Sequence, residues 1–101
     1  PLPDHVLSSV IRLVHSTRPD SGEADDYVKR YVAWGAGPRA SQTLVQAARA
    51  AALLGGNSAT SVEEVLFVAK EVLRHRVIPN YNATGDGVQA DDIIEHVISR
   101  V

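Results

Sequence analysis

The sequence contains no cysteine, which excludes disulfides, thiolate metal sites and cysteine nucleophiles and fits a reducing compartment. It has no apolar run near the roughly 18 residues that a membrane helix needs, and no signal peptide. Its formal net charge of −2 provides no field that would attract nucleic acid or an anionic membrane. These absences favour a cytoplasmic protein that binds neither nucleic acid nor membranes.

What is present is an apolar share of 45%, mostly aliphatic residues and alanine, in a chain of 101 residues, which is an ordinary domain length. Because the apolar spacing is helical almost throughout, we expect one all-α domain over residues 1–101, a small bundle of about five helices. No segment alternates long enough to predict a convincing sheet. The chain begins at Pro1 rather than Met, so we expect a fragment of a longer protein.

The first helix is expected within residues 3–19, where Asp4 is placed to cap it and Pro19 marks its end. Its core-facing stripe is predicted to be Leu7, Val10, Ile11 and Val14. A second, short helix is expected in residues 25–34, extending toward Trp34. Both begin with aspartate, which the positive end of a helix dipole favours.

Two further helices are expected at residues 60–76 and 90–101, joined by a connector that is extended around Pro79. The former opens with a capping box of Ser61 and Glu64. Its predicted buried residues are Val65, Leu66, Ala69, Val72 and Leu73. The last helix presents Ile93, Ile94, Val97, Ile98 and Val101, and its capping is left to Asp91 and Asp92 because neither Gln89 nor Ala90 has a hydroxyl group.

The remaining helix differs from the others at its start. Gly37 can serve as its N-cap and Pro38 as its first residue, while Gly55-Gly56 ends it. Its first turn holds Arg39 and no acidic residue, a placement that is unfavourable by a few tenths to about 1 kcal/mol. A glycine-flanked helix N-terminus binds anions, most often phosphate, and a guanidinium adds donors suited to phosphate oxygens. The sequence therefore predicts an anion site at Gly37, Pro38 and Arg39.

Alternatives remain for Arg39, which could instead pair with Asp25 or Asp86 or lie in solvent. The chain has no complete phosphate-binding loop and no acidic motif that could hold magnesium. An anion at Arg39 would therefore be held mainly by another part of a larger protein.

The segments "LVHSTRP", "WGAGPRASQTL", "AARAAALLGG", "VEEVLFVAKEVLRHRVIPNYNA" and "GDGVQADDII" together resemble the C-terminal helical lid of MoxR-type AAA+ ATPases. The likeness keeps the family's order over nearly the whole chain, although such lids often begin the last helix with a hydroxyl cap. The resemblance implies that the lid packs beside an α/β core, which carries the phosphate loop, the acids that bind Mg²⁺ and the arginine finger. ATP and Mg²⁺ would then belong to the core, and the fragment alone would not be an enzyme.

By the same resemblance, Arg39 falls on the sensor-2 arginine, which reaches the γ-phosphate of ATP bound in the core. The family is similar to other AAA+ proteins in forming rings, commonly hexamers. Its members are thought to be chaperones, often with partners that carry von Willebrand factor A domains.

Other basic residues have two interpretations each. Arg74, His75 and Arg76 at one helix end, and Arg18 at another, suit the negative end of a helix dipole, but could also contact the core or an adjacent subunit. Trp34 is expected to anchor its loop against the domain core, with stacking on adenine as the alternative. The four histidines are never spaced as i, i+4 with one another. Glu71 with His75 and Asp92 with His96 have that spacing, but two such ligands do not make a metal site, so we expect exposed helical pairs.

A competing hypothesis is a stand-alone helical protein-interaction module. A DNA-reading helix-turn-helix fits less well, because the helix at residues 39–54 offers few polar contacts and the chain is acidic overall. A parent reading frame with an upstream phosphate loop would favour the lid interpretation.

Overall fold

The structure is a computed structural model that describes residues 2–101. This part of the chain forms six α-helices and two short strands. They are α1 (Asp4–Ser16), α2 (Asp26–Tyr31), β1 (Val32–Trp34), α3 (Pro38–Leu54), α4 (Val62–Leu73), β2 (Ile78–Pro79), α5 (Tyr81–Asp86) and α6 (Ala90–Ser99). The predicted small helical bundle is confirmed, with one helix more than expected and a small sheet in addition.

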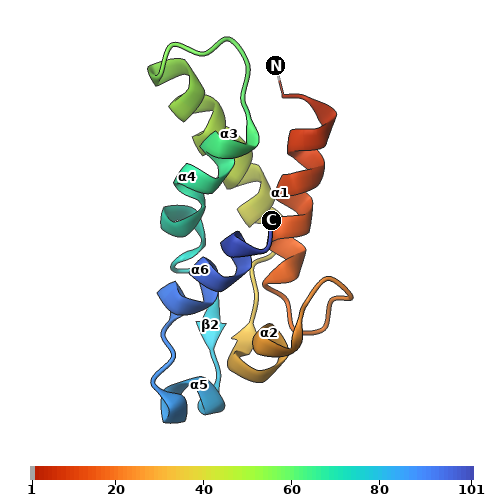
Figure 1. The fold of residues 1–101 in the computed structure, drawn as a ribbon, viewed down its shortest axis with the longest axis vertical. Helices are drawn as coiled ribbons and strands as arrows, with labels where there is room; N and C mark the ends of the chain where they lie inside the picture. Colours follow the sequence, from red (N-terminus) through yellow and green to blue (C-terminus); the bar gives the residue numbers. More distant parts are fainter. Residues whose placement is uncertain (1) are drawn as a thin grey trace.

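The helices form an elongated molecule of 44 × 23 × 21 Å. Figure 1 shows α1, α3 and α4 in the upper part, with α2, α5 and the strands at the lower end. The most extensive packing joins α3 to α4, while α1 packs on α3 and α6 packs on α4. This arrangement places the start of α3 near the end of α1, beside the segment that leaves the sheet.

The face that α3 buries is made of small residues. Ala40, Leu44, Ala48 and Ala52 recur every four residues and are at most 3% exposed. Because the distance between packed helices depends on the side chains at their contact, this alanine stripe permits close packing.

The buried face of α1 differs from the predicted stripe. Val6, Val10, Leu13 and Val14 are buried, whereas Leu7 and Ile11 are 41% and 42% exposed. The apolar residues of α1 cover more than one face of the helix, so their spacing alone did not identify the face that packs on the other helices. Asp4 is not the cap either, because the N-cap is Pro3 and Asp4 is the first helical residue.

The segment predicted to continue the second helix to Trp34 is instead β1. It pairs antiparallel with β2, placing Val32 opposite Pro79 and Trp34 opposite Ile78. In addition, the Asn80 N–H donates to the Tyr31 carbonyl over 2.8 Å. Backbone groups after Tyr31 thus find partners in a distant segment, which a helical pattern could not reveal.

The predicted connector also contains α5, which the sequence analysis missed. The Asn80 side chain accepts from the Ala83 N–H at 3.1 Å and so caps this helix. Gly87, with φ of 74°, ends it in the left-handed conformation. Both signals, Asn80 and Gly87, were present in the sequence.

The predicted capping box of Ser61 and Glu64 is confirmed, and of the two aspartates expected to cap the last helix Asp92 does so. The Ser61 N–H donates to the Glu64 carboxylate at 2.9 Å, and the Gln89 N–H donates to Asp92 at 2.9 Å. Among residues expected in the core, Leu66 is only partly buried and Val101 is 45% exposed. Within the described residues, no helix has the length and apolar character to cross a membrane.

Candidate functional site

The candidate site is the start of α3, and its backbone matches the sequence prediction. Gly37 is the N-cap in an extended conformation (φ −100°, ψ −170°), and Pro38 is the first helical residue. No side chain caps this helix, and its first turn contains no acidic residue. The positive end of the α3 dipole is therefore not neutralised by its own first turn.

Two residues that the sequence analysis missed hold this helix start in place. Thr17, which is fully buried, donates to the Val14 carbonyl at 2.6 Å and accepts from the Ala36 N–H at 2.9 Å. A Cβ on Gly35 would lie 2.4 Å from the Thr17 carbonyl oxygen, so only glycine permits this close approach. The end of α1 and the segment that enters α3 are thus locked together by hydrogen bonding and packing.

Arg39 is exposed in the first turn of α3. Neither its guanidinium nor any other group of its side chain forms an ion pair or hydrogen bond within residues 2–101. The two aspartates considered as partners are occupied elsewhere: Asp25 pairs with His96 and Arg100, and Asp86 with Arg30. The interpretation that Arg39 pairs with Asp25 or Asp86 is therefore wrong, which leaves exposure to solvent or binding of an anion from outside the chain.

Arg18 lies beside the same helix start. It lines a hollow of about 220 Å³ together with Gly37, Pro38, His15 and Ser41. It forms no ion pair among the described residues. The Arg18 backbone packs against Gly35, which places this residue beside the start of α3. Contact of Arg18 with the core or an adjacent subunit stays a prediction, beside the interpretation that its charge suits the negative end of the α1 dipole.

Trp34 does not anchor the loop against the core, so that expectation is wrong. Its side chain is 72% exposed. It lines a hollow of about 310 Å³ with Arg18, Asp20 and the 35–37 segment. The strand β1 directs it outward, and no other described element covers it. An exposed indole beside the start of α3 remains compatible with the alternative of stacking on a base.

The basic cluster at the end of α4 has partners within the chain. Arg74 donates to Asp91 through Nε at 3.0 Å and also lies 3.5 Å from Glu71. The hydrogen bond to Asp91 and the two carboxylate charges raise the pKa of Arg74 above its usual value. Arg76 donates to the Val72 carbonyl at 3.0 Å and so satisfies the helix end. The Arg76 contact fits the helix-end interpretation, whereas Arg74 pairs with side chains of α4 and α6 and His75 is exposed. Contact of these residues with the core or an adjacent subunit stays a prediction.

The histidines do not gather into a metal site. His96 contacts Asp25 at 2.6 Å, rather than the Asp92 that precedes it by one helical turn. No group of three or more histidine and acidic side chains in residues 2–101 has a geometry that could hold a metal ion. The chemistry that the α3 start offers is binding, through backbone N–H groups and guanidinium donors that suit the oxygens of an anion.

Comparison with known proteins gives a consistent result. A family model described as "AAA lid domain" matches residues 24–97. The chain is 37% identical over 96 residues to "Chaperone MoxR1" of Mycobacterium tuberculosis, covering 95% of this chain and 26% of that protein. It is 30% identical over 91 residues to "Uncharacterized protein YeaC" of Bacillus subtilis, covering 77% of this chain and 28% of that protein.

A solved structure has the same fold. It is a crystal structure from Cytophaga hutchinsonii, provisionally described as an ATPase, which superposes with a TM-score of 0.91 at 29% identity. The match covers 99% of this chain and 30% of that one. The chain therefore spans less than a third of the length of each of these proteins, and the resemblance noted in the sequence is confirmed.

Proposed function

Because this chain belongs to the AAA lid domain family, we propose that it is the C-terminal lid of a longer MoxR-type ATPase and supplies Arg39 to ATP bound in the core of that protein. The observation that carries the proposal is the exposed guanidinium at an uncapped helix start, with no ion pair inside the described chain. Such a charge is unfavourable for the isolated helix and becomes favourable when an anion is brought to it.

In the proposed mechanism, the γ-phosphate draws Arg39 toward it and so fixes the angle between lid and core. Loss of the γ-phosphate on hydrolysis releases this contact, and the lid moves as a rigid body. A charge-assisted hydrogen bond contributes about 1.5–3 kcal/mol, which is comparable to a typical allosteric coupling energy of about 1–3 kcal/mol. One arginine is therefore sufficient to couple nucleotide state to lid position.

Rigid movement requires that displacement at Arg39 reaches the whole domain. The Thr17 and Gly35 contacts tie the start of α3 to α1, and the alanine stripe packs α3 closely on its neighbours. A force applied at the first turn of α3 is therefore transmitted to two other helices without bending a flexible loop. This tight connection supports a lid that moves as one piece.

The proposal assigns the remaining machinery to the rest of the parent protein. ATP and Mg²⁺ bind in the core, and this chain contributes the basic helix start that approaches the phosphates. We expect the parent to act in the cytoplasm as a chaperone-like ring, commonly a hexamer, in which lids contact neighbouring subunits. Proteins with von Willebrand factor A domains are the expected partners. These expectations follow from the family resemblance.

The test is Arg39→Ala in the full-length parent, measured as steady-state ATP turnover and ring assembly. We expect turnover to fall at least tenfold with assembly retained, because the lost contact acts on the phosphate. Arg12→Ala is the matched control, since Arg12 is an exposed arginine on α1 without an ion pair in the described chain. Turnover near that of the wild type in Arg39→Ala would contradict the proposal.

A second measurement concerns the 101-residue chain by itself. We expect it to hydrolyse no ATP and to bind the nucleotide with at best millimolar affinity, because one arginine and a helix start are a small part of a nucleotide site. Micromolar ATP binding by this chain, measured by calorimetry, would show that it owns a complete site and would exclude the lid mechanism as proposed.

A further inference from the structure

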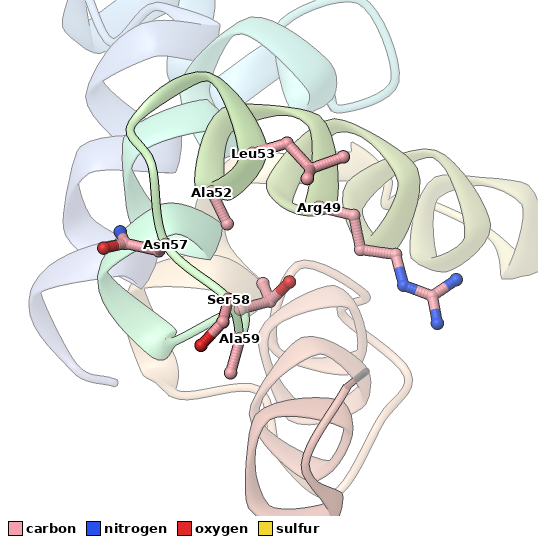
Figure 2. A pocket seen from close by; sticks show the side chains of 7 residues that line it. Arg49, Ala52, Leu53, Asn57, Ser58 and Ala59 are labelled. Carbon is pink, nitrogen blue, oxygen red and sulfur yellow. The ribbon is translucent and has the colours of Figure 1, made fainter.

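A hollow of about 310 Å³ lies at the opposite end of α3 from Arg39, between the last turns of that helix and the loop that enters α4. The lining residues that matter are Arg49, Ala52 and Leu53 of α3 and Ser58, Ala59 and Thr60 of the loop. Figure 2 shows Arg49 and Leu53 projecting from the helix, with Ser58 and Ala59 on the loop that faces them. Its volume is at the lower end of the range of about 300–1,000 Å³ for ligand pockets.

The backbone around this hollow is held by hydrogen bonds. Gly56 adopts φ of 80°, its N–H donates to the Leu53 carbonyl at 3.0 Å, and the Asn57 N–H donates to the Ala52 carbonyl at 2.8 Å. This pair of bonds is the Schellman arrangement that ends a helix. The other end of the loop is fixed by the bond from the Ser61 N–H to Glu64. The hollow is therefore formed before any ligand arrives.

Thr60 provides a polar group without a partner. Its residue is 5% exposed, yet its hydroxyl forms no hydrogen bond within residues 2–101. Every completely occluded side-chain nitrogen or oxygen in this part of the chain has a partner, so the Thr60 hydroxyl must keep some accessible surface. Thr60 is also one of the residues that line the hollow. The hydroxyl has no partner within the described chain, so it is available to donate a hydrogen bond to a ligand in place of water.

The charge and polarity of the walls define what that partner must offer. Arg49 is the one charged residue lining the hollow, and it has no ion pair in the described chain. The adjoining wall is apolar, formed by Ala52, Ala59 and a Leu53 side chain that is 76% exposed. A cation and a hydroxyl beside an apolar wall complement a carboxylate that is joined to an aliphatic group.

We propose that this hollow binds a peptide segment of a partner protein in which an aspartate or glutamate adjoins a large aliphatic residue. Arg49 and Thr60 donate hydrogen bonds to the carboxylate, and the aliphatic side chain packs on Ala52, Leu53 and Ala59. A peptide fits better than a free anion, because the exposed Leu53 would gain nothing from a small ion. The site lies at the far end of α3 from Arg39, so it does not depend on the ATP-linked function.

The test uses the 101-residue chain labelled with ¹⁵N, titrated with the acetylated and amidated pentapeptide Gly-Leu-Glu-Leu-Gly and followed by NMR. We expect saturable shifts confined to residues 49–60. Replacing the peptide's glutamate by glutamine, or introducing Arg49→Gln or Thr60→Val, weakens binding roughly tenfold, because each change removes a hydrogen bond to a charged group. Arg12→Gln is the matched control and leaves the affinity unchanged.

The thermal midpoint separates loss of binding from loss of folding. Valine has the shape of threonine, and the Thr60 hydroxyl has no partner in the chain, so Thr60→Val should not lower the midpoint. The proposal is overturned if Arg49→Gln and Thr60→Val bind as tightly as the wild type, or if no shifts appear at millimolar peptide. Equal shifts from sodium acetate would indicate a simple anion site instead, and equal binding of a lysine-for-glutamate peptide would exclude carboxylate recognition.

Discussion

In the described part of the chain, charged side chains form ion pairs on the helices α2, α4, α5 and α6, which we call the paired side, but not on α1 and α3, which we call the unpaired side. All six ion pairs of the described residues join groups on α2, α4, α5 and α6 or on the residues that cap them, and none involves α1 or α3. Residues 4–18 and 38–54 nevertheless contain four arginines and a single acidic residue, Asp4. The basic residues of the α1–α3 side are thus left without partners inside the chain.

Asp25 illustrates the paired side. Its carboxylate accepts from the Val28 N–H at 3.0 Å and contacts His96 at 2.6 Å and Arg100 at 3.2 Å. The His96 ring also stacks on Tyr27, with 4.1 Å between ring centroids. One carboxylate therefore caps α2 and fastens α6 to it. On this side charges hold helices together, whereas on the α1–α3 side they remain available to other molecules.

The variant with the largest expected effect tests whether α1 and α3 are held together by packing, since no ion pair of the described residues joins them. Gly35→Ala puts a Cβ 2.4 Å from the Thr17 carbonyl oxygen and 2.6 Å from the Arg18 Cα, both of them backbone atoms. We expect a loss of about 1–3 kcal/mol in the free energy of unfolding, or more, because backbone cannot move aside cheaply. Gly22→Ala, where a Cβ meets nothing within 4 Å, is the control. Urea unfolding that gave both variants equal stability would show that the start of α3 is loosely held.

A smaller effect is expected from breaking the paired side. Asp25→Ala removes the cap of α2 and the contacts to His96 and Arg100 together, so we expect a loss of about 1–2 kcal/mol in urea unfolding. Asp20→Ala is the control, because Asp20 is exposed and has no ion pair in the described residues. If both alanine variants were equally stable, the contrast between the two sides would have no energetic meaning.

The same carboxylate gives the paired side a pH dependence. Burial by itself raises the pKa of Asp25, but hydrogen bonds from His96 and the Val28 N–H and the charges of His96 and Arg100 together lower it. Because the pKa of Asp25 is lower in the folded than in the unfolded state, its ionised form stabilises the fold at pH values above the unfolded-state pKa of about 4. This contribution disappears as the pH falls through the folded-state pKa. The stability difference between the wild type and Asp25→Asn should therefore shrink between pH 5 and pH 2.

Urea unfolding at several pH values measures this difference, with Asp20→Asn as the control that should follow the wild type throughout. A gap between the wild type and Asp25→Asn that stayed constant down to pH 2 would mean that the ionised carboxylate adds nothing beyond its role as a hydrogen-bond acceptor.

How much the sequence could predict depended on the range of the interactions involved. The start of α3 at Gly37 and Pro38, and the caps from Glu64 and Asp92, were predicted because each signal acts within one helical turn. The capping of α5 by Asn80 was equally local and could have been found. Local chemistry thus identified the candidate site.

The rest of the site depended on contacts between distant segments. Thr17 meets the Ala36 N–H across 19 residues, and the need for Gly35 arises only because α1 ends against it. Trp34 was assigned to the core from its apolar character, but its exposure depends on which elements cover β1. Likewise, the lack of an ion pair at Arg39 within the described residues became clear only when Asp25 and Asp86 were found with other partners.

The smallest expected effect is the most direct test of the unpaired side. Arg39→Glu replaces a cation by an anion at the positive end of α3, so we expect the isolated chain to gain about 0.3–1 kcal/mol in urea unfolding. Arg49→Glu makes the same charge change outside the first and last turns of α3, where the dipole effect falls off, and should lack this gain. A loss of stability in Arg39→Glu would reveal a partner within the chain and would break the contrast. Increased stability together with lost ATP turnover in the parent would mean that the arginine is retained for a ligand outside the domain, because nothing inside it benefits from that charge.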